Sequence, residues 1–118
     1  MLEQILQELA HRSIVASIRA GVLHVPLGEG CPDLWITADP DDDVTLYFEG
    51  SYWHTHADLL EGEDPVQAVA GFCAAILDGR LHVIRITFPT GAREVRVTDD
   101  LEGEKDLIEP GETLDVLR

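Results

Sequence analysis

The chain has 118 residues, of which 45% are hydrophobic, and its formal net charge at pH 7 is −15. This length fits one domain with a sizeable core, and no apolar run approaches the roughly 20 residues that a membrane-spanning helix needs. Such an excess of acids repels nucleic acid and anionic membranes and attracts basic protein surfaces, so we expect no direct nucleic-acid binding and no membrane binding.

The acids are unevenly distributed. No Lys or Arg occurs between Arg19 and Arg80, and that interval holds twelve acids. The stretch from Asp99 onward contains eight more acids and only two basic residues, Lys105 and Arg118. An acidic surface of this kind steers the approach of a basic protein partner, although the charge also has a simpler reading as an aid to solubility.

The N-terminus and the cysteines indicate a reducing compartment. The opening "MLEQILQELAHRSI" carries acids early and lacks the basic region of a signal peptide, so we expect a cytoplasmic protein. Two cysteines are too few for a disulfide framework and lack zinc-site spacing. Cys73 is expected to be buried on a helix, and Cys31 has no cation beside it in the sequence that would lower its pKa.

The first half of the chain predicts one helix followed by a meander of strands. Leu2, Ile5, Leu6 and Leu9 recur at helical spacing, and residues 14–30 then suggest one or two strands. Three alternating segments follow, "DLWITAD", "VTLYFEG" and "YWHTHA". The turn "DPDDD" separates the first two, because Asp and Pro favour turns.

The second half predicts a helix, a hairpin and an acidic arm. Asp64 suits a helix cap, Pro65 the first helical position and Gly79 the position after the end. "LHVIRITF" and "REVRVTD" predict two strands. We expect a single α+β domain over 1–118, with an antiparallel sheet of about five to six strands and two helices packed on one face. An acidic C-terminal arm from about residue 99 is expected to be docked or partly disordered.

Two histidines, His54 and His56, stand one residue apart on a predicted strand and share a face with Tyr52. Two neighbouring imidazoles suit zinc, and Asp58 continues the same parity if the strand does. His24 and His82 are further candidates without a fixed position. These residues are weak candidates for metal ligands.

The segment "WHTHA" resembles the JAMM-type metalloproteases, whose motif is His-Ser/Thr-His-Pro with a downstream Ser-x-x-Asp. The resemblance implies a zinc-dependent hydrolase. This chain departs from the motif, with Ala57 in place of Pro, Asp64 in place of Ser and Gln67 in place of the ligand Asp. Upstream, only Glu3 or Glu8 is far enough away to match the family's catalytic Glu. We therefore expect no metal and no cofactor, and keep a metal-dependent hydrolase using His54 and His56 as the alternative.

Other chemical motifs are absent or incomplete. Asp39, Asp41 and Asp43 match the first positions of a calcium loop, but Val44 stands where such a loop needs Gly and Gly50 where it needs Glu. A turn is the better interpretation. No serine lies in a nucleophile motif, so we expect no catalytic residues and favour a protein that is not an enzyme.

Aromatic residues and acids predict a binding surface. Alternation places Trp35 and Tyr47 opposite the apolar rows of their strands, where they would anchor a partner. If a second layer covers that face, they are core residues instead. The acids would steer the encounter. The expected partner-binding residues are Trp35, Tyr47, Asp41, Asp42, Asp43, Glu61 and Glu63.

Residues 44–86 are similar to small uncharacterised bacterial proteins that have a Trp-His-x-His strand followed by a helix ending in an "ILxG" turn. Here those residues read "LYFEGSYWHTHAD" and "AILDGRLHVIRI". Some of these proteins look like immunity proteins of bacterial toxin systems. The resemblance implies a non-enzymatic protein-binding role, with a basic toxin as the partner. A protein that mimics DNA and binds a basic nuclease is a further reading of the charge.

Overall fold

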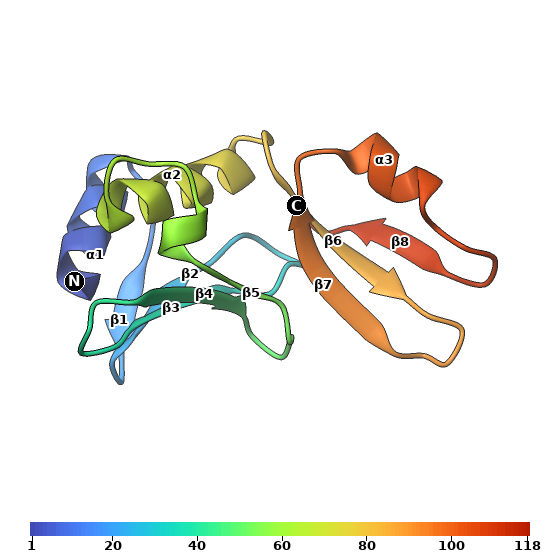
Figure 1. The fold of residues 1–118 in the computed structure, drawn as a ribbon, viewed down its shortest axis with the longest axis horizontal. Helices are drawn as coiled ribbons and strands as arrows, with labels where there is room; N and C mark the ends of the chain where they lie inside the picture. Colours follow the sequence, from blue (N-terminus) through green and yellow to red (C-terminus); the bar gives the residue numbers. More distant parts are fainter.

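A computed structural model describes all 118 residues (Figure 1). The elements are α1 (Leu2–His11), β1 (Ser17–Arg19), β2 (Val22–Val25), β3 (Leu34–Ala38), β4 (Val44–Phe48), β5 (His54–His56), the 3₁₀ helix η1 (Ala57–Leu59), α2 (Pro65–Leu77), β6 (His82–Thr87), β7 (Arg93–Thr98), α3 (Leu101–Asp106) and β8 (Thr113–Val116). Strands β1 to β5 form one antiparallel meander, and β6 to β8 form a second antiparallel sheet in the order β7-β6-β8. The predicted α+β class is confirmed.

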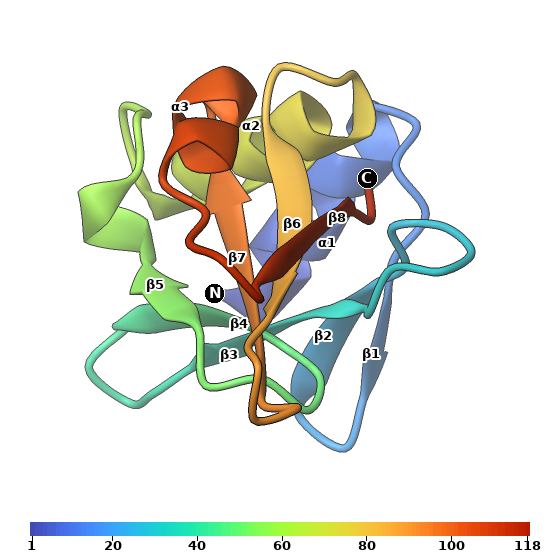
Figure 2. The same cartoon turned by 90° about the vertical axis from the view of Figure 1, so that its right-hand side faces the viewer.

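Helices α1 and α2 lie side by side on one face of the five-stranded sheet (Figures 1 and 2). The predicted apolar stripe of α1 is inward, with Ile5 and Leu9 fully buried. Helix α2 begins as its sequence predicts, because the Asp64 side chain accepts a 2.8 Å hydrogen bond from the backbone N–H of Gln67. Gly79, just past its end, has a φ of +85°, a conformation that glycine adopts without strain.

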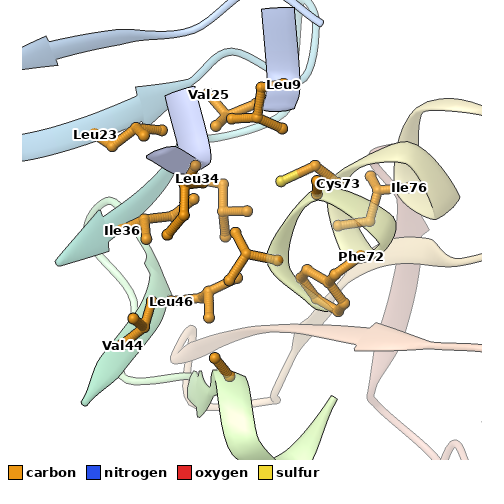
Figure 3. Close-up of a cluster of buried hydrophobic side chains, with 14 of the residues drawn as sticks. Leu9, Leu23, Val25, Leu34, Ile36, Val44, Leu46, Phe72, Cys73 and Ile76 are labelled. Carbon is orange, nitrogen blue, oxygen red and sulfur yellow. The ribbon is translucent and has the colours of Figure 1, made fainter. Parts of the chain in front are cut away.

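The main core lies between these helices and the five-stranded sheet (Figure 3). Strand alternation supplies one side of it, because every second residue points to the same face. Leu34 and Ile36 of β3 and Leu46 of β4 are fully buried, whereas the residues between them are only half-buried. On α2, Cys73 and Ile76 are also fully buried. The predicted inward rows of β3 and β4 are therefore correct.

The second sheet adds to the same core through one of its faces. Val83 of β6 belongs to the main buried cluster, and Val95, Val97 and Leu117 pack against that cluster. Ile84 alternates to the other face, where the neighbouring Arg96 reaches Glu104 of α3 with a 2.8 Å ion pair. The small sheet is thus held between the main core and α3.

The C-terminal arm is ordered, which decides between the two predicted alternatives. Strand β8 pairs with β6, placing Leu114 opposite Ile86. The backbone N–H of Leu117 donates to the carbonyl of Val83 at 2.8 Å, and Arg118 Nη2 donates to the carbonyl of Leu77 at 3.0 Å. The sequence did not predict a separate three-stranded sheet, because β8 is short and lies in an acidic background. None of the helices combines the length and apolar character that crossing a membrane requires.

Candidate functional site

The face of the five-stranded sheet opposite α1 and α2 carries a continuous row of aromatic and histidine side chains. Strand register places His24 opposite Trp35, Trp35 opposite Tyr47, and Tyr47 opposite His54. The rings of His24 and Trp35 are 5.0 Å apart, and those of Trp35 and Tyr47 are 5.7 Å apart in an edge-on arrangement. We call His24, Trp35, Tyr47 and His54 the aromatic row. It crosses four adjacent strands, β2 to β5.

The aromatic row lies at the surface. No helix covers this side of the sheet in either view of the molecule (Figures 1 and 2). Trp35 and Tyr47 are half-buried by their neighbours, and His54 is exposed. The sequence left open whether a second layer covers these aromatic residues. No such layer is present, because the C-terminal sheet packs against the main core instead.

The indole N–H of Trp35 has no hydrogen-bond partner, although its nitrogen is shielded from solvent. A buried donor without a partner costs about 1–3 kcal/mol. The aromatic row thus contains an unsatisfied donor at its centre.

A second row beside the first is polar. Thr37 pairs with Thr45, and Thr45 pairs with His56. His56 Nδ1 lies 3.3 Å from the Thr45 hydroxyl and 3.5 Å from a carboxylate oxygen of Asp43. The ring centroids of His54 and His56 are 5.4 Å apart, with the ring planes perpendicular. The predicted pairing of the two histidines on one face is correct.

The acidic turn 39–43 lies at the end of this open face. Asp39 accepts hydrogen bonds at 2.9 Å from the backbone N–H groups of Asp41 and Asp43, and Asp42 has a φ of +60°. These are the features of an Asp-rich turn, as predicted in place of a calcium loop. The carboxylates of Asp41, Asp42 and Asp43 remain exposed beside the polar row.

The other predicted acidic loop lies elsewhere. Glu61 and Glu63 belong to the connection between η1 and α2, and Gly62 between them packs directly on Ala68 of α2. This loop is on the helix side of the sheet (Figure 2). The predicted binding residues therefore divide into two groups. Trp35, Tyr47 and Asp41 to Asp43 share the open face, whereas Glu61 and Glu63 do not.

Strand β5 is shorter than the predicted strand. Tyr52 precedes it and is fully exposed, so strand alternation does not place Tyr52 with the histidines. Asp58 lies in η1, so the condition on which it would share their face is not met. The physical reason is the shortness of β5, which has only three residues.

No group of three or more His, Cys, Asp or Glu side chains in the chain is arranged to hold a metal ion. The two further histidine candidates are separated from the pair. His24 is on β2, and His82 is on the second sheet, where its Nδ1 lies 3.2 Å from the carbonyl of Arg118. The structure therefore supplies a pair of imidazoles and no third protein ligand beside them.

The cysteine thiols are poor nucleophiles. Burial raises the pKa of Cys31 to about 11, and the nearby Arg118 guanidinium only partly opposes this effect. Burial likewise raises the pKa of Cys73 to about 12. Because the thiolate is the reactive form, neither side chain is prepared for covalent chemistry.

The sequence did not predict one feature, a cleft of about 790 Å³ that lies between β5 and α2 on one side and β7 of the second sheet on the other. Trp53 and Phe72 line it together with Leu60, Val97 and Thr98. Trp53 stacks on Phe72 and also packs on Phe48, which settles the parity of the strand: Trp53 faces the helices and His54 faces solvent. No sequence signal places β7 next to this cleft, since the approach of the second sheet depends on tertiary packing.

Comparisons of the chain with protein-family models, with curated proteins and with solved structures found no match.

Proposed function

We propose that this protein is a non-enzymatic protein-binding module that docks a basic partner on the open face of its five-stranded sheet. The observation that carries the proposal is the aromatic row: four rings aligned across β2 to β5 at the surface, next to an exposed acidic turn. Tryptophan and tyrosine are the residues that most often dominate binding energy at protein interfaces.

Trp35 and Tyr47 would act as the anchors of this interface. Both are held in place by edge-on packing within the row, so that little side-chain entropy is lost on binding. Docking there would bury the apolar area that both rings leave at the surface.

The charge distribution supports a basic partner. The net charge is −15, and the turn with Asp41, Asp42 and Asp43 is exposed at the end of the open face. Charges of this sign accelerate encounter with a positive surface and do so more strongly at low ionic strength. Glu61 and Glu63, on the helix side, would contribute to the general field rather than to the interface.

The partner class that we favour is a basic bacterial toxin, which this protein would neutralise by covering its active site as an immunity protein does. Support for this finer statement comes from the resemblance over residues 44–86. A DNA mimic would use the same charge. Nothing in the arrangement favours the alternative of a metal-dependent hydrolase, because such sites use three protein ligands.

The test is direct binding to a basic protein encoded beside this chain, measured by titration calorimetry at two salt concentrations. Trp35→Ala and Tyr47→Ala should each weaken binding at least about 30-fold, as expected for anchor residues. The matched control is Leu59→Ala, because Leu59 is an exposed apolar residue on the helix side, with 74% of its surface accessible. Equal affinities for the Trp35, Tyr47 and Leu59 variants would rule out the open face as the interface.

A salt titration separates the steering from the anchoring. Asp41→Asn with Asp43→Asn should slow association and flatten its dependence on salt, whereas Glu61→Gln with Glu63→Gln should have a smaller effect. An association rate that is the same in low and high salt would show that the acidic surface plays no part in recruiting the partner. Growth rescue of cells that express the neighbouring gene would then test the immunity role itself.

A further inference from the structure

The two histidines of β5 have a geometry that suits coordination of one metal ion. With Zn–N bonds of about 2.1 Å and a tetrahedral angle, the centroids of two coordinated imidazoles lie roughly 5 Å apart. The observed separation of the His54 and His56 ring centroids is 5.4 Å. Both side chains extend from the open face of the same short strand, so the backbone already fixes their spacing.

The hydrogen bonds of the two rings leave one nitrogen of each available. His54 Nδ1 lies 3.4 Å from the backbone carbonyl of Tyr52. A carbonyl can only accept, so Nδ1 carries the proton and the lone pair of the neutral ring is at Nε2. His56 Nδ1 lies 3.5 Å from the Asp43 carboxylate and 3.3 Å from the Thr45 hydroxyl. The carboxylate likewise favours a proton on Nδ1 of His56.

This arrangement is the one that metal-binding histidines normally show. A histidine ligand donates its second ring N–H to a backbone carbonyl or a carboxylate, which fixes the tautomer and the ring orientation. His54 has the carbonyl as its hydrogen-bond partner, whereas for His56 the Asp43 carboxylate lies 3.5 Å away as a charge contact and the hydrogen-bond partner is the Thr45 hydroxyl. His24 and His82 do not form such a pair. His24 packs on Trp35, and His82 lies on β6 of the second sheet.

We infer that His54 and His56 form a two-histidine chelate for a divalent transition-metal ion, with both Nε2 atoms as ligands and Asp43 as a positioning residue for His56. Imidazole nitrogen selects Zn²⁺, Cu²⁺ or Ni²⁺ over Mg²⁺ and Ca²⁺, which prefer oxygen ligands. The remaining coordination positions belong to water. The site does not rest on the proposed protein-binding role, because metal binding requires only the two rings and the groups that orient them, but it shares His54 with the aromatic row.

The experiment is calorimetric titration of the untagged full-length protein, stripped of metal with chelator, with ZnCl₂ as the probe. We expect about one ion per chain, and at least a tenfold loss of affinity in both His54→Ala and His56→Ala. The matched control is His24→Ala, which removes an imidazole from the same face and should leave zinc affinity unchanged. Zinc should also raise the melting temperature of the wild type and not that of the two pair variants.

Asp43→Asn tests the positioning role separately. Loss of an outer carboxylate typically reduces metal affinity about 10–100-fold, so an unchanged affinity would overturn the role assigned to Asp43. Absence of stoichiometric binding, or binding that survives both His54→Ala and His56→Ala, would overturn the site itself. In the latter case the ion is held by the acidic surface. Circular dichroism of each variant verifies that the exposed substitutions leave the fold intact.

Discussion

Trp53 stacks almost parallel on Phe72, with 6.2 Å between the ring centroids and 8° between the ring planes. The same indole lies 5.1 Å from the ring of Phe48. Trp53 therefore joins the end of the five-stranded sheet to α2 and lines the cleft beside them. One residue further on, His54 points to the opposite face and to solvent.

Replacing Trp53 by Ala should be far more costly than replacing the other tryptophan. Because Trp53 is only partly buried, we expect a loss of roughly 2–3 kcal/mol in the free energy of unfolding, below the 3–5 kcal/mol of a fully buried aromatic. Trp35→Ala, on the open face, should lose about 1 kcal/mol or less, since its removal also deletes an unsatisfied donor. Urea denaturation of both variants checks this order, and a larger loss for Trp35 would contradict it.

The sequence predicted what local rules determine. The cap at Asp64, the glycine at 79 and the alternation in β3 and β4 depend on a few adjacent residues, and all were found where expected. The alternation also identified Trp35 and Tyr47 as members of one face. These are properties of secondary structure, which local patterns in the sequence predict directly.

Longer-range relationships were not accessible in the same way. The alternation of β5 does not specify which of its faces is buried, and the stacking of Trp53 on a helix that follows it decides this. The separation of Glu61 and Glu63 from the open face depends on the packing of Gly62 against Ala68. The pairing of β8 with β6 connects segments about 30 residues apart, and neither strand alone specifies it.

The C-terminal sheet should unfold together with the rest of the molecule. Ile84 is fully buried in the small sheet, and its neighbour Val83 belongs to the main core. Ile84→Ala should therefore reduce the free energy of unfolding by about 2–4 kcal/mol. Val116→Ala, its cross-strand partner with 46% of its surface exposed, should cost well under 1 kcal/mol, as surface truncations usually do. Calorimetry should show one transition for both variants, and a separate early transition in Ile84→Ala would mean that the second sheet is an independent unit.

Two glycines should respond to alanine in opposite ways. Gly71 lies inside α2, and a Cβ there meets nothing closer than Arg12 Nη1 at 3.9 Å. Gly71→Ala should stabilise the protein by about 0.5–1 kcal/mol, because alanine has the higher helix propensity and restricts the unfolded chain. At Gly62 a Cβ would come within 2.6 Å of the backbone of Ala68, so Gly62→Ala should be destabilising. A melting temperature above that of the wild type for Gly71→Ala and below it for Gly62→Ala would confirm this. A stabilised Gly62→Ala would show that the loop 60–64 is not packed on α2.

Burial of Cys73 predicts how stability changes in alkaline solution. Burial raises the pKa of this thiol from 9.0 to about 12 in the folded protein. Between these two values the unfolded chain has lost the proton and the folded chain retains it. The unfolded state then binds fewer protons, so stability falls as pH rises. The contribution of Cys73 is complete below pH 9 and is lost progressively toward pH 12.

Cys73→Ala removes this contribution and leaves every other titrating group in place. The difference in unfolding free energy between wild type and variant should be constant from pH 7 to 8.5. Above pH 9 it should shrink with a slope approaching about 1.4 kcal/mol per pH unit. Denaturation curves collected at matched pH values measure it. A difference that stays constant up to pH 10.5 would mean that Cys73 titrates alike in both states, and rapid labelling of native Cys73 by a thiol reagent at pH 8 would contradict its burial on the inner face of α2.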